Sequence, residues 1–481
     1  MRWPLAALAL LASAAPAQRP TSAERQAADT VRRIGQLDRK GPKLGAVIAL
    51  TPDWRAQART IDRQPVTGPL HGRPILIKDN IETRELPTTA GSLALAGNRT
   101  GQDAPLVARL RGAGALILGK TNLSEWANFR STRSISGWSA TGGIVRNPYA
   151  LDRTACGSSS GSAVAVAAGL AWGAIGSETD GSITCPASMN GVVGLKSTQG
   201  LISGAGIVPL SHSQDTAGPI ARTVRDVAEL LGVIAEGPHR VDYATGLGAG
   251  LKGVRIGVLR RVGPNPAMPP LFDAAIEKLR AAGAELVDIP DFPQPAGLGD
   301  AETIILLTDF KVDLDAYLAK APSAVTPRDL AALIAFNDAN RAREMPYFGQ
   351  ELFVQAQATK GLDDPAYRAA KTKAAGAGNT LDTLFAKYRV AMIVQPTTGP
   401  AYPINPVQGD KGEGPSASQL PAMSGYPHLT VPMAQIQGLP VGLSFIGPKW
   451  SEAALLAAGA AFETQRGPLP GPTYRATVPV D

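Results

Sequence analysis

Two clusters rich in serine and glycine hold the residue types that could do chemistry in this chain. The first reads Cys-Gly-Ser-Ser-Ser-Gly-Ser over residues 156–162, and the second reads Glu-Thr-Asp-Gly-Ser-Ile-Thr-Cys-Pro-Ala over residues 178–187. Upstream, Lys78 ends the short apolar run Ile-Leu-Ile. A serine hydroxyl needs a base to take its proton, and a lysine can be that base only when uncharged. Because burial disfavours the charged amine, Lys78 is a candidate base.

The histidines and cysteines give little support to a metal centre. None of His71, His212, His239 and His428 pairs with another at the spacing of metal ligands, and no His-Glu-x-x-His motif occurs. The two cysteines lie on different motifs and do not make a zinc site. We therefore expect neither a metal nor an organic cofactor.

A second arrangement of the serines remains open. Residues 157–161 match Gly-x-Ser-x-Gly, the nucleophile elbow of α/β-hydrolases, with Ser159 as nucleophile and Asp215 and His428 as partners in the right chain order. That motif requires a strand immediately before it, whereas residues 147–153 read as a polar loop with a proline. Such matches are frequent in a chain rich in glycine and serine, so this esterase-like alternative has weak support.

The motif around Lys78 and the two serine clusters together resemble the amidase signature family. The matching motifs are Gly-x-Pro-x-x-x-Lys-Asp-Asn-Ile around Lys78, Gly-Ser-Ser-x-Gly-Ser-Ala in the first cluster and Asp-Gly-Ser-Ile-x-x-Pro-Ala in the second. Ser182 follows Ser158 by 24 residues, the spacing of the family. The resemblance covers nearly all of the chain after residue 17, including residues 119–122 and 438–442. It implies that Ser182 is the nucleophile, that Ser158, with a cis peptide bond, relays its proton, and that Lys78 is the final base.

The resemblance also implies how the rest of the site is built. Backbone N–H groups of Thr179, Asp180, Gly181 and the following serine are expected to form the oxyanion hole, and loss of such a donor typically costs about 100- to 1000-fold in rate. Ser159 and Asn122 are lesser candidates near the substrate. The implied reaction is hydrolysis of a carboxamide to carboxylate and ammonia through an acyl-enzyme.

Departures from the commonest family pattern bear on the choice of substrate. Asp180 replaces a glycine, Thr184 replaces an arginine, and Cys156 and Ser160 replace glycines. Together with Ala-Phe-Asn at 335–337 and Pro-Tyr-Phe-Gly-Gln at 346–350, these departures resemble the bacterial peptide amidase branch, whose members remove the C-terminal amide of peptides. The alternatives are an amidase of small aliphatic or aryl amides, the glutamine-hydrolysing component of an amidotransferase, and a non-catalytic binding protein.

Apolar runs alternate with helical patterns, which predicts an α/β fold with a largely buried sheet. The resemblance implies a single large α/β/α domain with a mixed central sheet covered by helices. Residues 301–389 change to a helical pattern with scattered aromatics, and we interpret them as a helical insertion or lid. Strands are expected at 47–50, 74–77, 115–118, 171–175, 254–259, 285–289, 390–394, 429–432 and 442–446, and helices at 103–112, 162–169, 271–282 and 452–462.

Composition and the N-terminal sequence indicate where the protein is located and which partners it lacks. The 481 residues are 44% hydrophobic and 18% charged, and the net charge of +7 is spread without a Lys/Arg block, so we expect no nucleic-acid partner. Residues 1–17 join Arg2 to a short apolar run and an Ala-Pro-Ala site, which predicts a signal peptide and a secreted or periplasmic protein. Residues 18–481 would be the amidase domain, a monomer without a membrane span. No disulfide between Cys156 and Cys185 is predicted, because the sequence does not show the geometry it requires.

Overall fold

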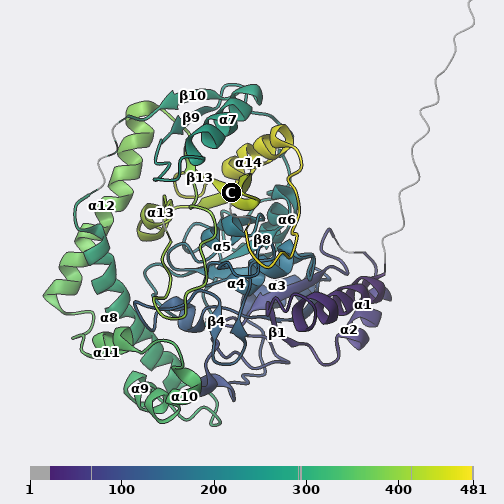
Figure 1. Ribbon diagram of the computed structural model, residues 1–481, viewed down its shortest axis with the longest axis vertical. Coiled ribbons are helices and arrows are strands. Elements are labelled where there is room, and N and C mark those ends of the chain that lie inside the picture. The colour runs from purple at the N-terminus through teal and green to yellow at the C-terminus, as the bar shows by residue number, and fades with distance from the viewer. Residues whose placement is uncertain (1–21, 67, 291, 293–294, 413, 479–481) are drawn as a thin grey trace, which may run out of the picture.

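A large mixed sheet organises the molecule. The computed structural model describes residues 22–66, 68–290, 292, 295–412 and 414–478, so the predicted signal peptide lies outside the described residues. Within them, 11 strands form one sheet with helices on both faces (Figure 1). In spatial order the strands are β1 (Val47–Leu50), β3 (Leu116–Thr121), β2 (Pro74–Lys78), β6 (Gly173–Glu178), β8 (Thr216–Ala221), β7 (Val193–Lys196), β12 (His428–Ile436), β13 (Leu439–Ile446), β11 (Met392–Pro396), β9 (Arg255–Val258) and β10 (Glu285–Asp288).

Strand directions are mixed, as expected from the sequence. β2 runs parallel to both β3 and β6, and β9 runs parallel to β10 and β11, whereas the strands between these groups pair antiparallel. A separate two-stranded ribbon joins β4 (Trp138–Ser139) to β5 (Gly143–Ile144). Because the carboxyl ends of parallel strands meet at one edge, the ends of β2 and β6 are brought together.

Helices cover both faces of the sheet. One core contains residues of α3, α6, α7 and α14, and the other contains residues of α1, α2, α4 and α5. The helices are α1 (Ala23–Arg33), α2 (Trp54–Asp62), α3 (Pro105–Gly112), α4 (Ser160–Ala167), α5 (Thr184–Met189), α6 (Val224–Ile234), α7 (Met268–Ala281), α8 (Leu298–Ala319), α9 (Leu330–Ala339), α10 (Arg341–Glu344), α11 (Glu351–Gln357), α12 (Pro365–Tyr388), α13 (Gln419–Ser424) and α14 (Glu452–Arg466).

Strand β2 shows why the sheet strands read as continuous apolar runs. Ile75 and Ile77 pack into the core under α3 and α6, whereas Leu76 packs into the core under α4. Successive side chains of a strand point to opposite faces, so a strand covered on both sides needs apolar residues at every position. Lys78 ends this strand and is fully buried.

The segment of residues 301–389 is helical in the structure. Helices α8 to α12 run from Leu298 to Tyr388, and the long helices α8 and α12 lie side by side along one flank (Figure 1). Phe310 and Phe353 stack at 5.0 Å between ring centroids and help to form a separate hydrophobic cluster with Trp126. The helical pattern was therefore predicted correctly, and its action as a lid stays a prediction.

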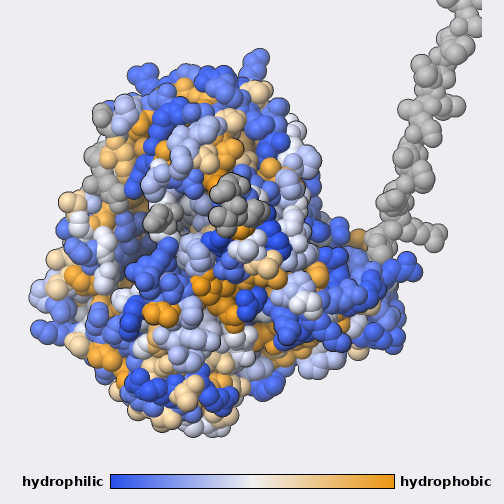
Figure 2. All heavy atoms as spheres, viewed as in Figure 1, coloured by the Kyte–Doolittle hydropathy of each residue, from blue (hydrophilic) through white to orange (hydrophobic). Residues whose placement is uncertain are grey.

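Polar residues gather on the outer helices at one end. Figure 2 shows hydrophilic residues over α1 and α2, whose exposed faces carry ion pairs such as Arg59 with Glu24 at 2.9 Å. None of the helices in the described part of the chain is long and apolar enough to cross a membrane.

Helix α4 offers a test of the central packing. A Cβ added at Gly161 would overlap the backbone oxygens of Ala46 and Asn122, so Gly161→Ala should lower the melting temperature by several degrees or prevent folding. Gly376→Ala, in the middle of α12, meets nothing within 4 Å and should be neutral or stabilise by about 0.5–1 kcal/mol. Thermal denaturation of both variants measures this difference, and equal melting temperatures would contradict it.

Candidate active site

The amine of Lys78 lies among three oxygens at the carboxyl end of β2. Its Nζ is 2.8 Å from Ser158 Oγ, 2.9 Å from Ser177 Oγ and 3.1 Å from the Ser177 carbonyl oxygen. The Asn80 side-chain amide also donates to Ser177 Oγ, at 2.9 Å. A neutral amine has two N–H donors and one lone pair. Both donors can go to Ser177, whose carbonyl only accepts, and the lone pair then faces the Ser158 hydroxyl.

Burial sets the charge of this amine. Lys78 is fully buried, and the loss of hydration lowers its pKa to about 7, although the charges of Asp215 and Glu178 oppose the shift. The difference from the ordinary value of 10.5 corresponds to about 5 kcal/mol in favour of the neutral amine. A substantial fraction of Lys78 is therefore neutral near pH 7, as a base requires.

Backbone hydrogen bonds join the two serine clusters to each other and join the first cluster to Ser124. The Ser159 N–H donates to the Ser182 carbonyl at 3.0 Å, and the Ser124 N–H donates to the Ser158 carbonyl at 3.0 Å. The Gly157–Ser158 peptide bond is cis, as the family resemblance implied. Ser159 is fully buried, and its hydroxyl bonds the backbone of Ser177 rather than facing a cavity.

Residues 179–182 form a turn after β6, here called the donor turn, whose backbone donors are unpaired. No described residue accepts a hydrogen bond from the backbone N–H groups of Thr179, Asp180, Gly181 or Ser182. The Ser182 hydroxyl likewise has no partner among the described residues, and Ser182 is 7% exposed. Free N–H groups beside a free hydroxyl are the arrangement that binds a carbonyl oxygen during attack.

Glu178 fixes the shape of this turn. Its buried carboxylate accepts from the N–H groups of Ile183 at 2.7 Å and Thr184 at 2.9 Å, at the start of α5. The Thr184 hydroxyl also reaches the same carboxylate, at 3.2 Å. These bonds use the N–H groups that follow Ser182 and leave those before it unpaired. On the other side, the Thr179 hydroxyl donates to Asp215 at 2.6 Å.

The Asp180 side chain is paired with a second carboxyl group. It shares a hydrogen bond with Glu302 of α8 and accepts one from Ser418, while its Oδ1 is buried without a partner among the described residues. Burial and the Glu302 charge raise the pKa of Asp180 well above its usual value. Burial also raises the pKa of Glu302, which accepts hydrogen bonds from Gln214 and Gln419 at 2.9 and 3.0 Å.

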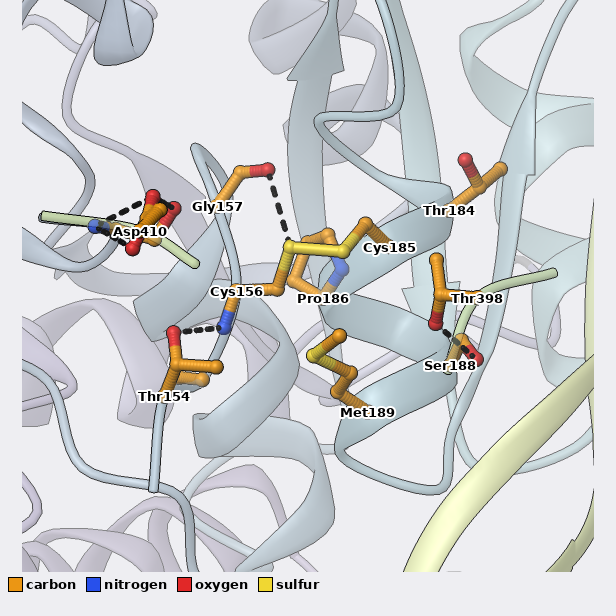
Figure 3. Close-up of a disulfide and its surroundings, with 12 residues drawn as sticks. Thr154, Cys156, Gly157, Thr184, Cys185, Pro186, Ser188, Met189, Thr398 and Asp410 are labelled. Carbon is orange, nitrogen blue, oxygen red and sulfur yellow. Dashed lines mark hydrogen bonds between the residues drawn. A yellow bond between two sulfur atoms is a disulfide. The ribbon is translucent and has the colours of Figure 1, made fainter. Parts of the chain in front are cut away.

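A disulfide bonds Cys156 to Cys185, which the sequence did not predict (Figure 3). The sequence could not reveal this bond because it depends on the two clusters meeting in space. Their Cα atoms are 6.0 Å apart, within the usual range for a disulfide. Cys156 lies two residues before Ser158 and Cys185 lies three residues after Ser182. The bond therefore ties the two segments that carry these serines.

The structure does not assemble the alternative elbow. His428 lies on β12, fully buried, with its Nε2 2.6 Å from Ser444 Oγ, and burial lowers its pKa to about 3. Asp215 bonds Thr179 and the backbone of residues 210 and 211. Neither residue contacts Ser159 through any hydrogen bond in the described part of the chain.

Asn122 and the motifs at 335–337 and 346–350 make hydrogen bonds to other parts of the protein. The Asn122 amide donates to the carbonyls of Gly45 and Gly143, and its oxygen accepts from Ser139 and from the Leu123 N–H, so its hydrogen bonds are made within the protein. In the helical segment, the Asn337 amide donates to Gln350 at 2.9 Å, which links residues 335–337 to residues 346–350.

Two cavities flank the donor turn. The larger, of about 760 Å3, is lined by Asn80, Ser177, Thr179 and Asp215 on the Lys78 side. The smaller, of about 240 Å3, is lined by Asp180 together with residues of β11 and α13. Neither Ser158 nor Ser182 lines either of these two cavities.

Sequence reasoning missed several residues that complete this site. Ser177 binds the lysine amine twice, and Glu178 and Asp215 hold the donor turn from either side. A polar Ser-Glu pair ending an otherwise small and apolar buried strand was the available signal for the first two. Nothing in the sequence placed Glu302 next to Asp180.

Fold and site together suit a serine hydrolase with a buried lysine beside its serines, and comparison with known proteins gives its family. The family described as Amidase matches residues 30–456, so this chain belongs to the amidase family. The native peptide amidase of Stenotrophomonas maltophilia has 48% identity and a TM-score of 0.89, over 94% of this chain and 96% of that one. This protein is accordingly an amide-hydrolysing enzyme.

Relatives in other organisms carry the same likeness. A probable amidase of Arabidopsis thaliana is 38% identical over 89% of this chain and 84% of the relative. The crystal structure of an amidase family protein from Bacillus anthracis has 31% identity and a TM-score of 0.83, over 94% of this chain and 89% of that one.

The buried amine predicts a pH profile. Because only the neutral form of Lys78 can accept a proton, kcat/KM should rise with pH and level off above about pH 7, with one deprotonation in the limb. Steady-state rates on one neutral amide substrate measure this directly. A kcat/KM that is level from about pH 5.5 to 9, or that rises only near pH 10, would contradict it.

The disulfide predicts a loss of stability on reduction. Cys156→Ser combined with Cys185→Ser should lower the free energy of unfolding by roughly 3.5 kcal/mol, given a sequence separation of 29. Each single variant should lose as much as the double variant, because either change removes the same bond. Denaturant unfolding with and without reductant provides the measurement. A wild-type protein whose midpoint is unchanged after its thiols have been released would oppose this account.

Proposed function

We propose that this enzyme hydrolyses the C-terminal amide of peptides, with Ser182 as nucleophile and Ser158 and Lys78 as its proton acceptors. The observation that carries the assignment of roles is the Lys78 amine, buried and 2.8 Å from Ser158 Oγ. Support for the peptide substrate comes from the likeness to a peptide amidase at 48% identity and from the two motifs at 335–337 and 346–350.

In the first half of the reaction, Ser182 Oγ attacks the carboxamide carbon. Its proton passes to Ser158 Oγ, while the Ser158 proton passes to the lone pair of Lys78. The carbonyl electron pair moves to the oxygen, where the free N–H groups of residues 179–182 receive it. When the C–N bond breaks, the proton returns through Ser158 to the nitrogen, and ammonia leaves.

In the second half, water attacks the acyl-enzyme and the same groups take its proton. The ester bond to Ser182 breaks, and the serine regains its proton from Lys78 through Ser158. The product leaves as a carboxylic acid, which ionises in water and gives its proton to the released ammonia. Lys78 begins and ends the cycle uncharged, so no external base or cofactor enters the balance.

A neutral Asp180 suits this chemistry. A carboxylate roughly 5 Å from a developing oxyanion would oppose it by about 3 kcal/mol at an effective dielectric constant near 20. Burial and the nearby charge of Glu302 raise the pKa of Asp180 well above its usual value, which favours the neutral form of Asp180. Asp180 thereby replaces the usual glycine without placing a charge in the oxyanion hole.

The same proposal includes a secreted or periplasmic location. The pattern of residues 1–17 supports export, and the Cys156–Cys185 bond is of a kind that persists in oxidising compartments. A mature N-terminus found after residue 17 on protein recovered outside the cytoplasm would agree. An intact N-terminus on cytoplasmic protein would contradict it.

Ammonia release is the direct test of activity and roles. The wild type should release ammonia from amidated peptides with a higher kcat/KM than from simple aliphatic or aryl amides. Ser182→Ala and Lys78→Met should each reduce turnover by roughly a thousandfold or more. Ser323→Ala, at an exposed loop position, is the matched control and should keep full activity.

Covalent labelling separates the proposal from the elbow alternative. A fluorophosphonate should modify Ser182, and mass spectrometry of the peptides locates the label. A label on Ser159, with Lys78→Met still active, would overturn the assignment of roles. A preference for simple amides would overturn only the peptide substrate.

A further inference from the structure

The small cavity beside the donor turn has no part in the proton-transfer scheme. Asp180, Ser416 and Gln419 line its polar side. A Cβ built on Gly181 would lie 3.1 Å from Ser418 Oγ, so this segment packs directly against the donor turn. The rest of the wall is mostly apolar and includes one charged residue, Arg261; its apolar residues are Leu259, Phe292, Leu381, Ile393, Ala417, Leu420 and Ile446.

Gln395 is a second residue of this cavity, besides Asp180, with a buried oxygen that has no partner among the described residues. It lies on β11 and lines the cavity, and it is only 4% exposed. Its side-chain amide makes no hydrogen bond with any residue that the structure describes, and its Oε1 is buried without a partner. Leaving a buried amide unpaired costs about 1–3 kcal/mol, so such a group calls for a partner.

A peptide group is the partner that fits a side-chain amide. An amide offers one acceptor and two donors, and it can pair with the N–H and the C=O of another amide. The cavity volume of about 240 Å3 is below the roughly 300–1,000 Å3 of drug-sized ligand pockets. It therefore suits one apolar side chain and its adjoining peptide group.

We propose that this cavity is the acyl-side subsite of the enzyme, in which the Gln395 amide binds the peptide group preceding the terminal residue and the apolar wall receives that residue's side chain. This inference rests on the proposed function. The donor turn that holds the carboxamide oxygen borders the cavity through Asp180, so the acyl part of a substrate can extend from Ser182 past Asp180 toward β11.

Paired substrates test the contact. N-acetyl-leucinamide has the peptide N–H, whereas its 2-acetoxy analogue has an ester oxygen there and keeps the same terminal carboxamide. The wild type should prefer the amide by about 5- to 100-fold in kcat/KM, as expected for one buried hydrogen bond. Gln395→Met, which keeps the side chain's length, should hydrolyse both analogues at nearly the same rate.

Controls separate a binding role from a structural one. Gln355→Met makes the same change at an exposed position of α11 and should keep the wild-type preference. Activity of Gln395→Met on propionamide, which lacks any peptide group, should stay within about twofold of the wild type. Equal losses on all three substrates, or an unchanged preference for the amide, would overturn the subsite.

A second variant tests the apolar wall should Gln395→Met fold poorly. Ala417→Leu adds volume to the cavity lining and should shift the preference from N-acetyl-leucinamide toward N-acetyl-glycinamide by tenfold or more, about 1.4 kcal/mol. An unchanged preference would overturn the proposal. A wild type that hydrolyses no amide at all would instead refute the proposed function.

Discussion

The burial of one lysine amine is the constraint on which the rest of the structure depends. Water would hold Lys78 in its charged form, and the packed ends of β2 and β6 remove that water. Three oxygens then replace it, two from Ser177 and one from Ser158. These oxygens match the donors and the lone pair of a neutral amine. The sheet thus provides both the desolvation that lowers the pKa of Lys78 and the contacts that orient its amine.

The elements around Lys78 follow from this requirement. Parallel pairing of β2 with β6 places Ile77 opposite Ile175 and brings Ser177 beside the amine. The donor turn follows β6 directly, held by Glu178 on one side and Asp215 on the other. The disulfide between Cys156 and Cys185 then joins the segment that carries Ser158 to α5, which follows the donor turn. The strand pairing, these hydrogen bonds and the disulfide limit movement around Lys78, where a small shift would separate its amine from the serine hydroxyls.

Sequence patterns predicted much of the frame because burial on both faces leaves a readable signal. The runs at 47–50 and 74–77 became β1 and β2, and the helical pattern at 452–462 became α14. Strand β8 was missed, since Thr-Ala-Gly-Pro-Ile-Ala has neither alternation nor a β-branched run. Gly218 is needed there because an added Cβ would overlap the Leu195 carbonyl of the neighbouring strand. Such close approach is a property of the pair of strands, and neither strand shows it alone.

For the candidate site too, some residues could be predicted from the sequence and others could not. Lys78, Ser158 and Ser182 could be selected because their motifs combine at characteristic spacing, although only the structure places the lysine beside its oxygens. Residues that reach the site from distant segments of the chain gave no recognisable sequence pattern. The Asp180–Glu302 pair, the unpaired Gln395 and the disulfide all depend on how distant segments return to the donor turn.

The charge of Lys78 can be measured without any substrate. Carbon-13 labelling of the lysine ε-carbons and NMR titration would report every amine, and the resonance lost in Lys78→Met identifies the one in question. The account predicts that this resonance titrates near pH 7, apart from Lys196, whose pKa burial lowers to about 8. A Lys78 resonance that titrates near pH 10, the ordinary range for a lysine amine, would contradict it.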